Sequence, residues 1–271
     1  MNYIFSGNLK GCYLNNCSDV VSKTKVKIYG HDKSVNVSSS IELTAPQAIL
    51  TRTQKEILHL SACLIAETET DESGNYSVEL NEKYNGGTVD IDICCIKAPI
   101  HLQKSGYHSP TEKQFHIGTV QPFWKQSTAH TSLHYYWEYQ INAKQWASLL
   151  KAFKLHIICG RVHSAPNNSP ITEGKVFAYD LDLLQDDYLG MAITDNNGYF
   201  KLFYLDDDYQ KTIFDHISSE WKNCPDVYFR IENNVGEILL QENRKCGNKQ
   251  NRRNAGNCLL VNFELNQQVS S

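Results

Sequence analysis

Histidine, aspartate and tyrosine are the residues of this sequence best suited to metal chemistry. His130 and His134 lie four positions apart, a spacing that places two imidazoles on one face of a helix, and His116 or His108 would supply a third zinc ligand. The residues around them do not follow a helical pattern. We therefore expect histidines of a surface or an interface, and no bound zinc.

Four aspartates gather before a predicted turn: Asp180, Asp182, Asp186 and Asp187. Carboxylate oxygens around a loop suit Ca²⁺, but the spacing of an EF-hand loop is absent. Because aspartates in turns usually accept main-chain hydrogen bonds, a solvated turn is expected and calcium is the alternative. The sequence also lacks Gly-x-Ser-x-Gly, a phosphate-binding glycine-rich loop and His-Glu-x-x-His, so no motif indicates hydrolysis or phosphoryl transfer.

A loop rich in Gly and Asn, residues 244–258, is strongly basic. Its basic side chains are Arg244, Lys245, Lys249, Arg252 and Arg253. Aromatic residues do not alternate with them, and the chain has a net charge of −4, so nucleic-acid binding is not expected. Long loops in compact sandwiches are often functional. We interpret this loop as a contact for a protein partner.

The cysteines and the N-terminal stretch bear on the compartment. The nine cysteines are an odd number, and the first residues lack the basic and apolar regions of a signal peptide. Reduced thiols are expected, in a cytoplasmic protein or in one exported without a standard signal peptide. Cys12 with Cys17, and Cys246 with Cys258, are the disulfide candidates. All apolar runs are shorter than the about 20 residues that a membrane-spanning helix needs.

One turn occurs twice in the chain. Asp71 and Gly74 in the first copy correspond to Asp195 and Gly198 in the second, and residues with strand-like alternation flank both turns. The aspartate side chain caps such a turn, and the glycine supplies the positive φ that lets the chain reverse. Both copies are therefore predicted β-hairpins.

The surroundings of the two hairpins repeat as well. In each half a strand containing a glycine comes first, then a strand that ends in Tyr29 or Tyr179, then the hairpin and an alternating strand. Short strands in a duplicated order predict a mainly β chain of two tandem antiparallel β-sandwiches, with an inserted, linking helix.

Three parts are expected along the chain. Residues 1–98 form the first sandwich, with an insertion at 31–60 that we interpret as an additional hairpin or excursion at its edge. Residues 99–154 form a linking segment rich in aromatic residues and histidine, and residues 155–271 form the second sandwich.

Two helices are predicted. Residues 142–153 have an apolar stripe at helical spacing, and Asn142 suits the N-cap position. The aromatic run before this helix predicts a strand packed on the first sandwich. Residues 205–221 predict the second helix, because the aspartates near its start are favourable at a helix N-terminus.

The second half resembles the transthyretin-like group, which includes the carboxypeptidase regulatory-like domains. The resemblance is carried by "ICGRV", "SPITEGKVFAYDLD", "DDYLGMAITDNNGYFKLFY" and "PDVYFRI". It is clear over residues 155–240 and looser over 3–95, where the Pro-Ile element is missing. The group consists mostly of non-catalytic folding, docking and adhesion modules, some of them attached to toxin-complex and contractile-injection proteins. The resemblance thus implies a fold and no particular activity.

We expect a non-catalytic structural or protein-interaction component, without cofactor or metal. Its partners would be other proteins or further copies of itself, with no nucleic acid and no membrane span, and a bacterial injection particle is one such assembly. Trp124, Trp137 and Tyr139 offer the kind of aromatic area that is enriched at interfaces, and with the basic loop they form the candidate interface.

Two alternatives belong to other classes of function. The first is a module that binds carbohydrate or another small ligand by stacking on Trp124, Trp137 and the tyrosines. The second is an iron enzyme similar to the intradiol dioxygenases, whose metal is held by two tyrosines and two histidines. Tyr179, Tyr204 and Tyr228 lie in predicted strands, but His216 is the only histidine after position 163. The His-x-His pair of such a site is absent.

Overall fold

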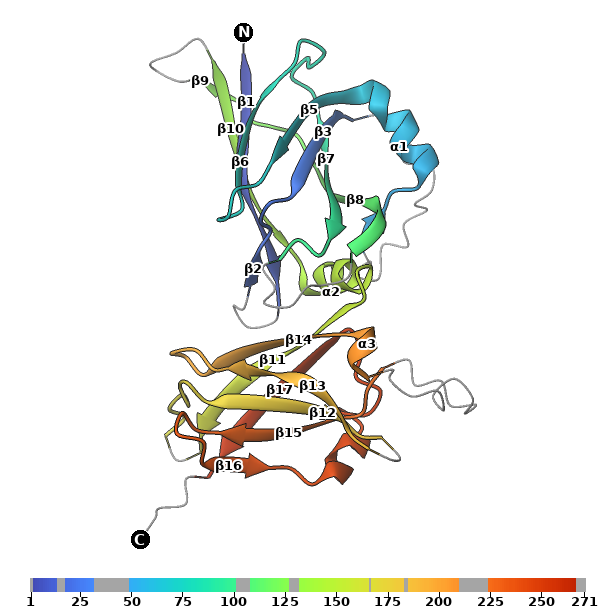
Figure 1. Ribbon diagram of the computed structural model, residues 1–271. Helices are drawn as coiled ribbons and strands as arrows, with labels where there is room; N and C mark the ends of the chain where they lie inside the picture. Colours follow the sequence, from blue (N-terminus) through green and yellow to red (C-terminus); the bar gives the residue numbers. More distant parts are fainter. Residues whose placement is uncertain are drawn as a thin grey trace. The chain divides into compact units, whose positions relative to one another are not determined.

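The chain forms two compact units, Met1–Leu149 and Leu150–Ser271 (Figure 1). Our description rests on a computed structural model. The residues that the structure describes are 2–13, 18–31, 49–100, 108–126, 132–165, 167–182, 185–209 and 224–266. Within these residues no sheet combines strands of both units. The prediction that each half builds its own sheets is confirmed.

The described strands of the first unit form two sheets. The first sheet has β1 (Tyr3–Cys12) at its centre, between β10 (Leu133–Ile141) and β6 (Asn75–Leu80), with β2 (Ser18–Val20) and β9 (Lys125–Gln126) as short additions. The second sheet has the order β4 (Leu50–Thr51), β8 (His108–Val120), β7 (Val89–Lys97), β3 (Lys25–Gly30) and β5 (Leu64–Glu69). Fully buried side chains from both sheets form the core, among them Phe5, Leu9, Val26, Ile28, Ile91, Ile93 and Phe115.

The second unit repeats this arrangement. One sheet has the order β14 (Tyr199–Leu205), β11 (Leu155–Ser164) and β17 (Cys258–Leu265). The other has the order β13 (Asp187–Ile193), β12 (Lys175–Asp180), β15 (Val227–Glu232) and β16 (Ile238–Gln241). Their buried faces share one core, which includes Ile158, Val162, Val176, Ala178, Phe200 and Phe229. The fold is mainly β, as predicted.

The duplication extends to strand pairing. In each unit the first strand pairs antiparallel with the second strand of the hairpin, as β1 does with β6 and β11 with β14. On its other side it pairs parallel with the last strand, as β1 does with β10 and β11 with β17. In the described part of the chain, all other strand pairs are antiparallel. The other sheet has a β-bulge at the same place in both units, next to Tyr29 and next to Tyr179.

The two predicted hairpin turns have the same geometry. Oδ1 of Asp71 and of Asp195 each accept hydrogen bonds from the main-chain N–H groups two and four residues later, at 2.8–2.9 Å. Gly74 and Gly198 have φ of 79° and 78°, a conformation that glycine adopts without a steric penalty. The four turn residues therefore act as the sequence predicts.

A glycine in each first strand permits the close approach of the parallel strand. A Cβ atom at Gly7 would lie 2.1 Å from the carbonyl oxygen of Trp137, and one at Gly160 would lie 1.5 Å from that of Val261. Both distances are far below van der Waals contact. Tyr76 and Phe200, the matching residues of the two hairpins, lie opposite these glycines in the register.

The segment 99–154, expected as a linker, contributes three strands to the sheets of the first unit. Its aromatic run is β10, a strand of the first unit as predicted, and it pairs in parallel with β1. The helix α2 (Ala143–Lys151) follows, and Asn142 caps it through a hydrogen bond from the main-chain N–H of Gln145 at 3.1 Å. Trp146 of this helix is fully buried and donates to the hydroxyl of Tyr13 at 2.8 Å.

Two other expected segments are described only in part. The described end of the 31–60 insertion is the short strand β4 and the helix α1 (Gln54–Leu60), followed by a turn of 3₁₀ helix at Ser61–Cys63, where a hairpin or excursion was expected. Of the 205–221 helix, only α3 (Asp206–Tyr209) lies within the described residues. A further 3₁₀ helix, Arg244–Asn248, begins the basic loop.

We expect Gly160→Ala to destabilise the second unit by roughly 3 kcal/mol, because the added methyl group must displace the main chain of β17. Urea denaturation followed by circular dichroism measures this change. Gly256→Ala is the matched control, since a Cβ atom there meets nothing within 4 Å. Equal stabilities for the two variants would contradict the close approach of β11 and β17.

Candidate functional site

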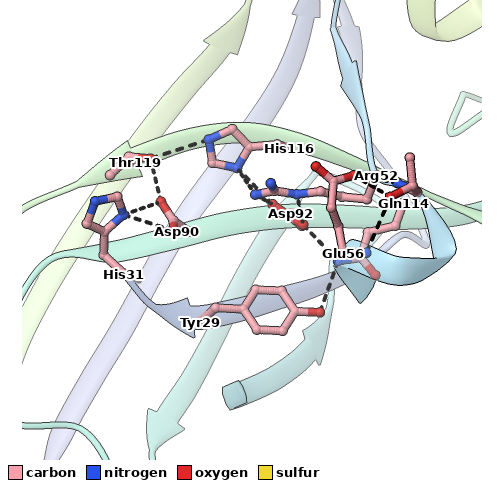
Figure 2. A network of polar contacts seen from close by, with 10 residues as sticks. Tyr29, His31, Arg52, Glu56, Asp90, Asp92, Gln114, His116 and Thr119 are labelled. Carbon is pink, nitrogen blue, oxygen red and sulfur yellow. Dashed lines mark hydrogen bonds and ion pairs between the residues drawn. The ribbon is translucent and has the colours of Figure 1, made fainter. Parts of the chain in front are cut away.

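A network of polar side chains lies on the outer face of the second sheet of the first unit (Figure 2). Residues of three adjacent strands point to this face: Tyr29 of β3, Asp90 and Asp92 of β7, and Gln114, His116 and Thr119 of β8. His31 follows β3, Arg52 comes just before α1, and Glu56 lies in the first turn of α1. We call these nine residues the polar face.

Asp92 is the centre of the polar face. Its side chain is fully buried, and it accepts hydrogen bonds from Nε of Arg52 at 3.0 Å and from the amide of Gln114 at 2.7 Å. Nδ1 of His116 lies 2.8 Å from its other oxygen. Burial raises the pKa of Asp92, but the hydrogen bonds from His116, Arg52 and Gln114 outweigh burial and hold the pKa below its ordinary value. Asp92 is therefore held as a carboxylate.

A second chain of contacts connects the two aspartates of β7. Nε2 of His116 lies 3.3 Å from the hydroxyl of Thr119, which donates to Asp90 at 2.5 Å. Asp90 also contacts Nδ1 of His31 at 3.0 Å. The side chains from Asp92 to His31 thus form one continuous hydrogen-bonded row, as the dashed lines in Figure 2 show.

Asp92, His116 and Thr119 have the order of an acid, a base and a hydroxyl nucleophile. The hydrogen bonds do not support nucleophilic chemistry. Thr119 has one hydroxyl proton, and it is donated to Asp90, so His116 faces the lone pairs of the oxygen. A general base needs to accept that proton. The guanidinium of Arg52 also covers His116, with Nη2 3.0 Å from Nδ1.

The polar face holds the described end of the insertion on the sheet. The main-chain N–H of Arg52 donates to the carbonyl of Gln114 at 2.8 Å, and β4 pairs with β8 just before it. Thr53 and Glu56 form a reciprocal capping box at the start of α1. Hydrogen bonds from Thr53 lower the pKa of Glu56, so its carboxylate is stabilised there. Arg52 is therefore fixed both by its main-chain hydrogen bond and by the contacts of its guanidinium.

Sequence reasoning missed the polar face. Only His116 was considered, as a zinc ligand. The available signal was the pair of aspartates in the alternating run "VDIDIC", because charged residues in the middle of a buried strand require partners. Their partners come from residues far away in the sequence, and no local pattern indicates them.

The predicted aromatic interface is largely packed within the first unit. Trp124 makes edge contacts with the rings of Tyr3 and Tyr84 and donates to the Tyr84 hydroxyl at 3.1 Å. Trp137 stacks on Tyr139 with a centroid distance of 4.6 Å. All three predicted residues are half-buried, so they are only partly available as a contact or stacking surface.

The basic loop divides into buried and exposed residues. Arg252 is buried, lies over the rings of Phe229 and Phe263, and pairs with Glu242 at 3.3 Å. Burial lowers the pKa of Arg252, although Glu242 opposes this effect. Arg244 is exposed and pairs with Asp186. The remaining basic residues of the predicted interface, Lys245, Lys249 and Arg253, are exposed.

The candidate metal residues do not converge. Oδ1 of Asp180 accepts from the main-chain N–H of Asp226 at 2.6 Å, and Asp186 pairs with Arg244. Within the described ranges no group of three or more His, Cys, Asp or Glu is placed to hold a metal ion. His130 and His216 lie outside these ranges, as does Cys17.

The three tyrosines considered as iron ligands do not come together, and the described candidate cysteines form no disulfide. Tyr179 and Tyr228 stack on each other with a centroid distance of 5.3 Å, whereas Tyr204 is buried beside His156 at 5.0 Å. Cys246 and Cys258 are free thiols, and so is Cys12. A hydrogen bond with Cys159 lowers the pKa of the Cys258 thiol.

Comparison with known proteins gives no family. No family model matches the chain, and no curated protein does. A 9R-lipoxygenase from Cyanothece is similar over 41% of this chain and 16% of its own, with 17% identity and a TM-score of 0.28. A putative carbohydrate-binding protein from Pseudomonas aeruginosa is similar over 52% and 88%, with 12% identity and a TM-score of 0.26.

A streptococcal ancillary pilin is similar over 98% of this chain and 62% of its own, with 9% identity and a TM-score of 0.23. Similarities this weak carry no argument for function. None of the helices in the described part of the chain combines the length and the apolar character needed to cross a membrane.

We expect Asp92→Ala to destabilise the first unit by about 3–5 kcal/mol, because Arg52 would keep a buried charge without its partner. Guanidinium denaturation measures the change. Glu67→Ala is the matched control on the same sheet: Glu67 is half exposed and pairs with Lys25 at 4.0 Å, so a change within about 1 kcal/mol is expected. A similar small change for Asp92→Ala would contradict the central role of Asp92.

Proposed function

We propose that the protein is a non-catalytic structural or protein-interaction component built from two duplicated β-sandwich units. The observation that carries this proposal is the polar face. Its acids, base and hydroxyl have the types and the order that catalysis requires. Their hydrogen bonds, however, are made to one another and to Arg52, on the segment that covers the sheet. The cluster fastens a segment to a sheet, which is a structural role.

The resemblance to the transthyretin-like group belongs to this proposal. Its support is the repeated strand order, with the same turn, the same bulge and the same glycine in both halves. We extend the proposal to membership of a larger protein assembly, of which a toxin or contractile-injection particle is one type. The resemblance motivates that extension.

An activated nucleophile would argue for an enzyme. A fluorophosphonate probe forms a covalent bond with a hydroxyl that a neighbouring base activates, with loss of fluoride. We expect no labelling of Thr119 in the intact chain, because its hydroxyl donates its hydrogen bond to Asp90 and His116 does not accept the proton. Labelling that disappears in Thr119→Val, while mass spectrometry maps it to this residue, would overturn the non-catalytic proposal.

An assembly component stays with its partners in a gentle extract of its own cells. We expect the chain to elute in size-exclusion chromatography well above the mass of the monomer, and to shift to monomer size in high salt or mild denaturant. The purified recombinant chain gives the monomer reference. Elution at monomer size in the native extract would contradict the assembly proposal.

A further inference from the structure

The second unit contains a counterpart of the polar face. In the first unit Asp92 lies opposite Lys27 in the register of β7 and β3, two residues before the bulge at Tyr29. In the second unit Arg230 lies opposite Phe177, two residues before the bulge at Tyr179. Arg230 thus has the position of Asp92, on the outer face of the sheet β13–β12–β15–β16.

This outer face carries large apolar side chains that remain exposed. On β13, Tyr188 is 46%, Met191 42% and Ile193 58% exposed, and Ile238 on β16 is 55% exposed. The register places Met191 next to Phe177, and Tyr188 next to Tyr179. Exposed apolar residues that gather on one sheet face indicate an interaction surface. We call this surface the open face.

The two units differ in the connection between two equivalent strands. In the first unit the chain between β3 and β5 includes β4 and α1, which add a strand beside β8 and place Arg52 on Asp92. In the second unit the corresponding connection, from β12 to β13, spans only residues 181–186. Among the described residues no strand pairs with the outer edge of β16, the counterpart of β8.

The charge at the centre of the open face is the reverse of that in the first unit. Arg230 lies over the ring of Phe177 and pairs with Glu232. Its Nε is out of contact with solvent and has no hydrogen-bond partner in the described structure. Lys175 lies opposite Glu232 in the register, so two cations face one anion at this position.

We propose that the open face docks an apolar polypeptide segment of another protein, and that a carboxylate of this segment binds Arg230. The inference rests on the proposed interaction function and names the surface and the chemistry of the partner. The first unit supplies the precedent within the same fold: there the sheet provides the carboxylate and the docked segment provides the arginine.

A polypeptide fits this surface for a further reason. The free edge of β16 offers main-chain N–H and C=O groups, which an extended segment pairs with when it adds a strand. β4 pairs with β8 in this way, at Leu50 and Thr51. Apolar side chains of this added strand would then cover Ile238 on β16. The rest of the segment would cross the outer face to cover Met191 on β13, at the opposite edge of the sheet.

Random dodecapeptides displayed on phage provide the probe. Phage are selected for binding to the full chain. Those that also bind the variant Met191→Glu, which has a carboxylate on the open face, are removed because they bind elsewhere on the chain. We expect enriched peptides with Asp or Glu between apolar residues. Binding of a synthetic peptide, measured by fluorescence anisotropy, should weaken by at least about 10-fold in Arg230→Glu and in Arg230→Gln. Replacing the carboxylate of the peptide by Lys should restore binding to Arg230→Glu.

Leu260→Glu is the matched control, because Leu260 lies on the other sheet of the second unit and is 40% exposed. It should leave binding unchanged, and thermal unfolding confirms that each variant folds. The proposal is overturned by a failure to enrich peptides, by enriched peptides without a carboxylate, or by binding that Arg230→Glu and Arg230→Gln leave intact.

Self-association of the purified chain that Met191→Glu abolishes would also overturn the proposal, because the occupant would then be a second copy. Failure of this docking proposal can be distinguished from failure of the proposed function by the behaviour of the assembly in the native extract. In the first case the native particle persists with Met191→Glu, and in the second case no particle forms with the unaltered chain.

Discussion

The architecture of both units depends on a first strand that pairs antiparallel with the second strand of the hairpin and parallel with the last strand of the unit. The parallel neighbour comes so close at Gly7 and Gly160 that no side chain fits between the two backbones. This neighbour is also the last strand of its unit, β10 or β17. The sheet that contains the first strand is therefore complete only when the last strand of the unit pairs with the first strand. Contacts so distant in sequence are costly in chain entropy, and the cores of both sheets offset that cost.

The close approach of the parallel strand does not restrict the side chains on the outer face of the other sheet, and these differ between the two units. At one position of the same register the first unit has Asp92 and the second has Arg230. An ionised side chain at this position needs a partner of opposite charge as it loses solvent. In the first unit Arg52, on a long connection, provides it. In the second unit the connection is short, Glu232 provides a partner from the same strand, and the apolar neighbours remain exposed.

Duplication followed by divergence of one face is consistent with how folds acquire functions. The shared parts are main-chain features, namely the turns at Gly74 and Gly198, the bulges and the close strand approach. The parts that differ are side chains on the sheet faces and the length of one connection. A fold does not by itself imply a function, so the function depends on those surfaces.

The sequence by itself determined the elements with local causes: the Asp71 and Asp195 turns, the helix after Asn142, the alternating strands and the duplication. Each depends on residues a few positions apart. The tertiary structure decided which strands neighbour each other, so it placed β10 beside β1, assigned β8 to the first unit and brought Arg52 to Asp92. It also buried Arg252, which the sequence suggested as an interface residue, against Phe229 and Phe263. Such pairings depend on long-range packing, and local pattern does not encode them.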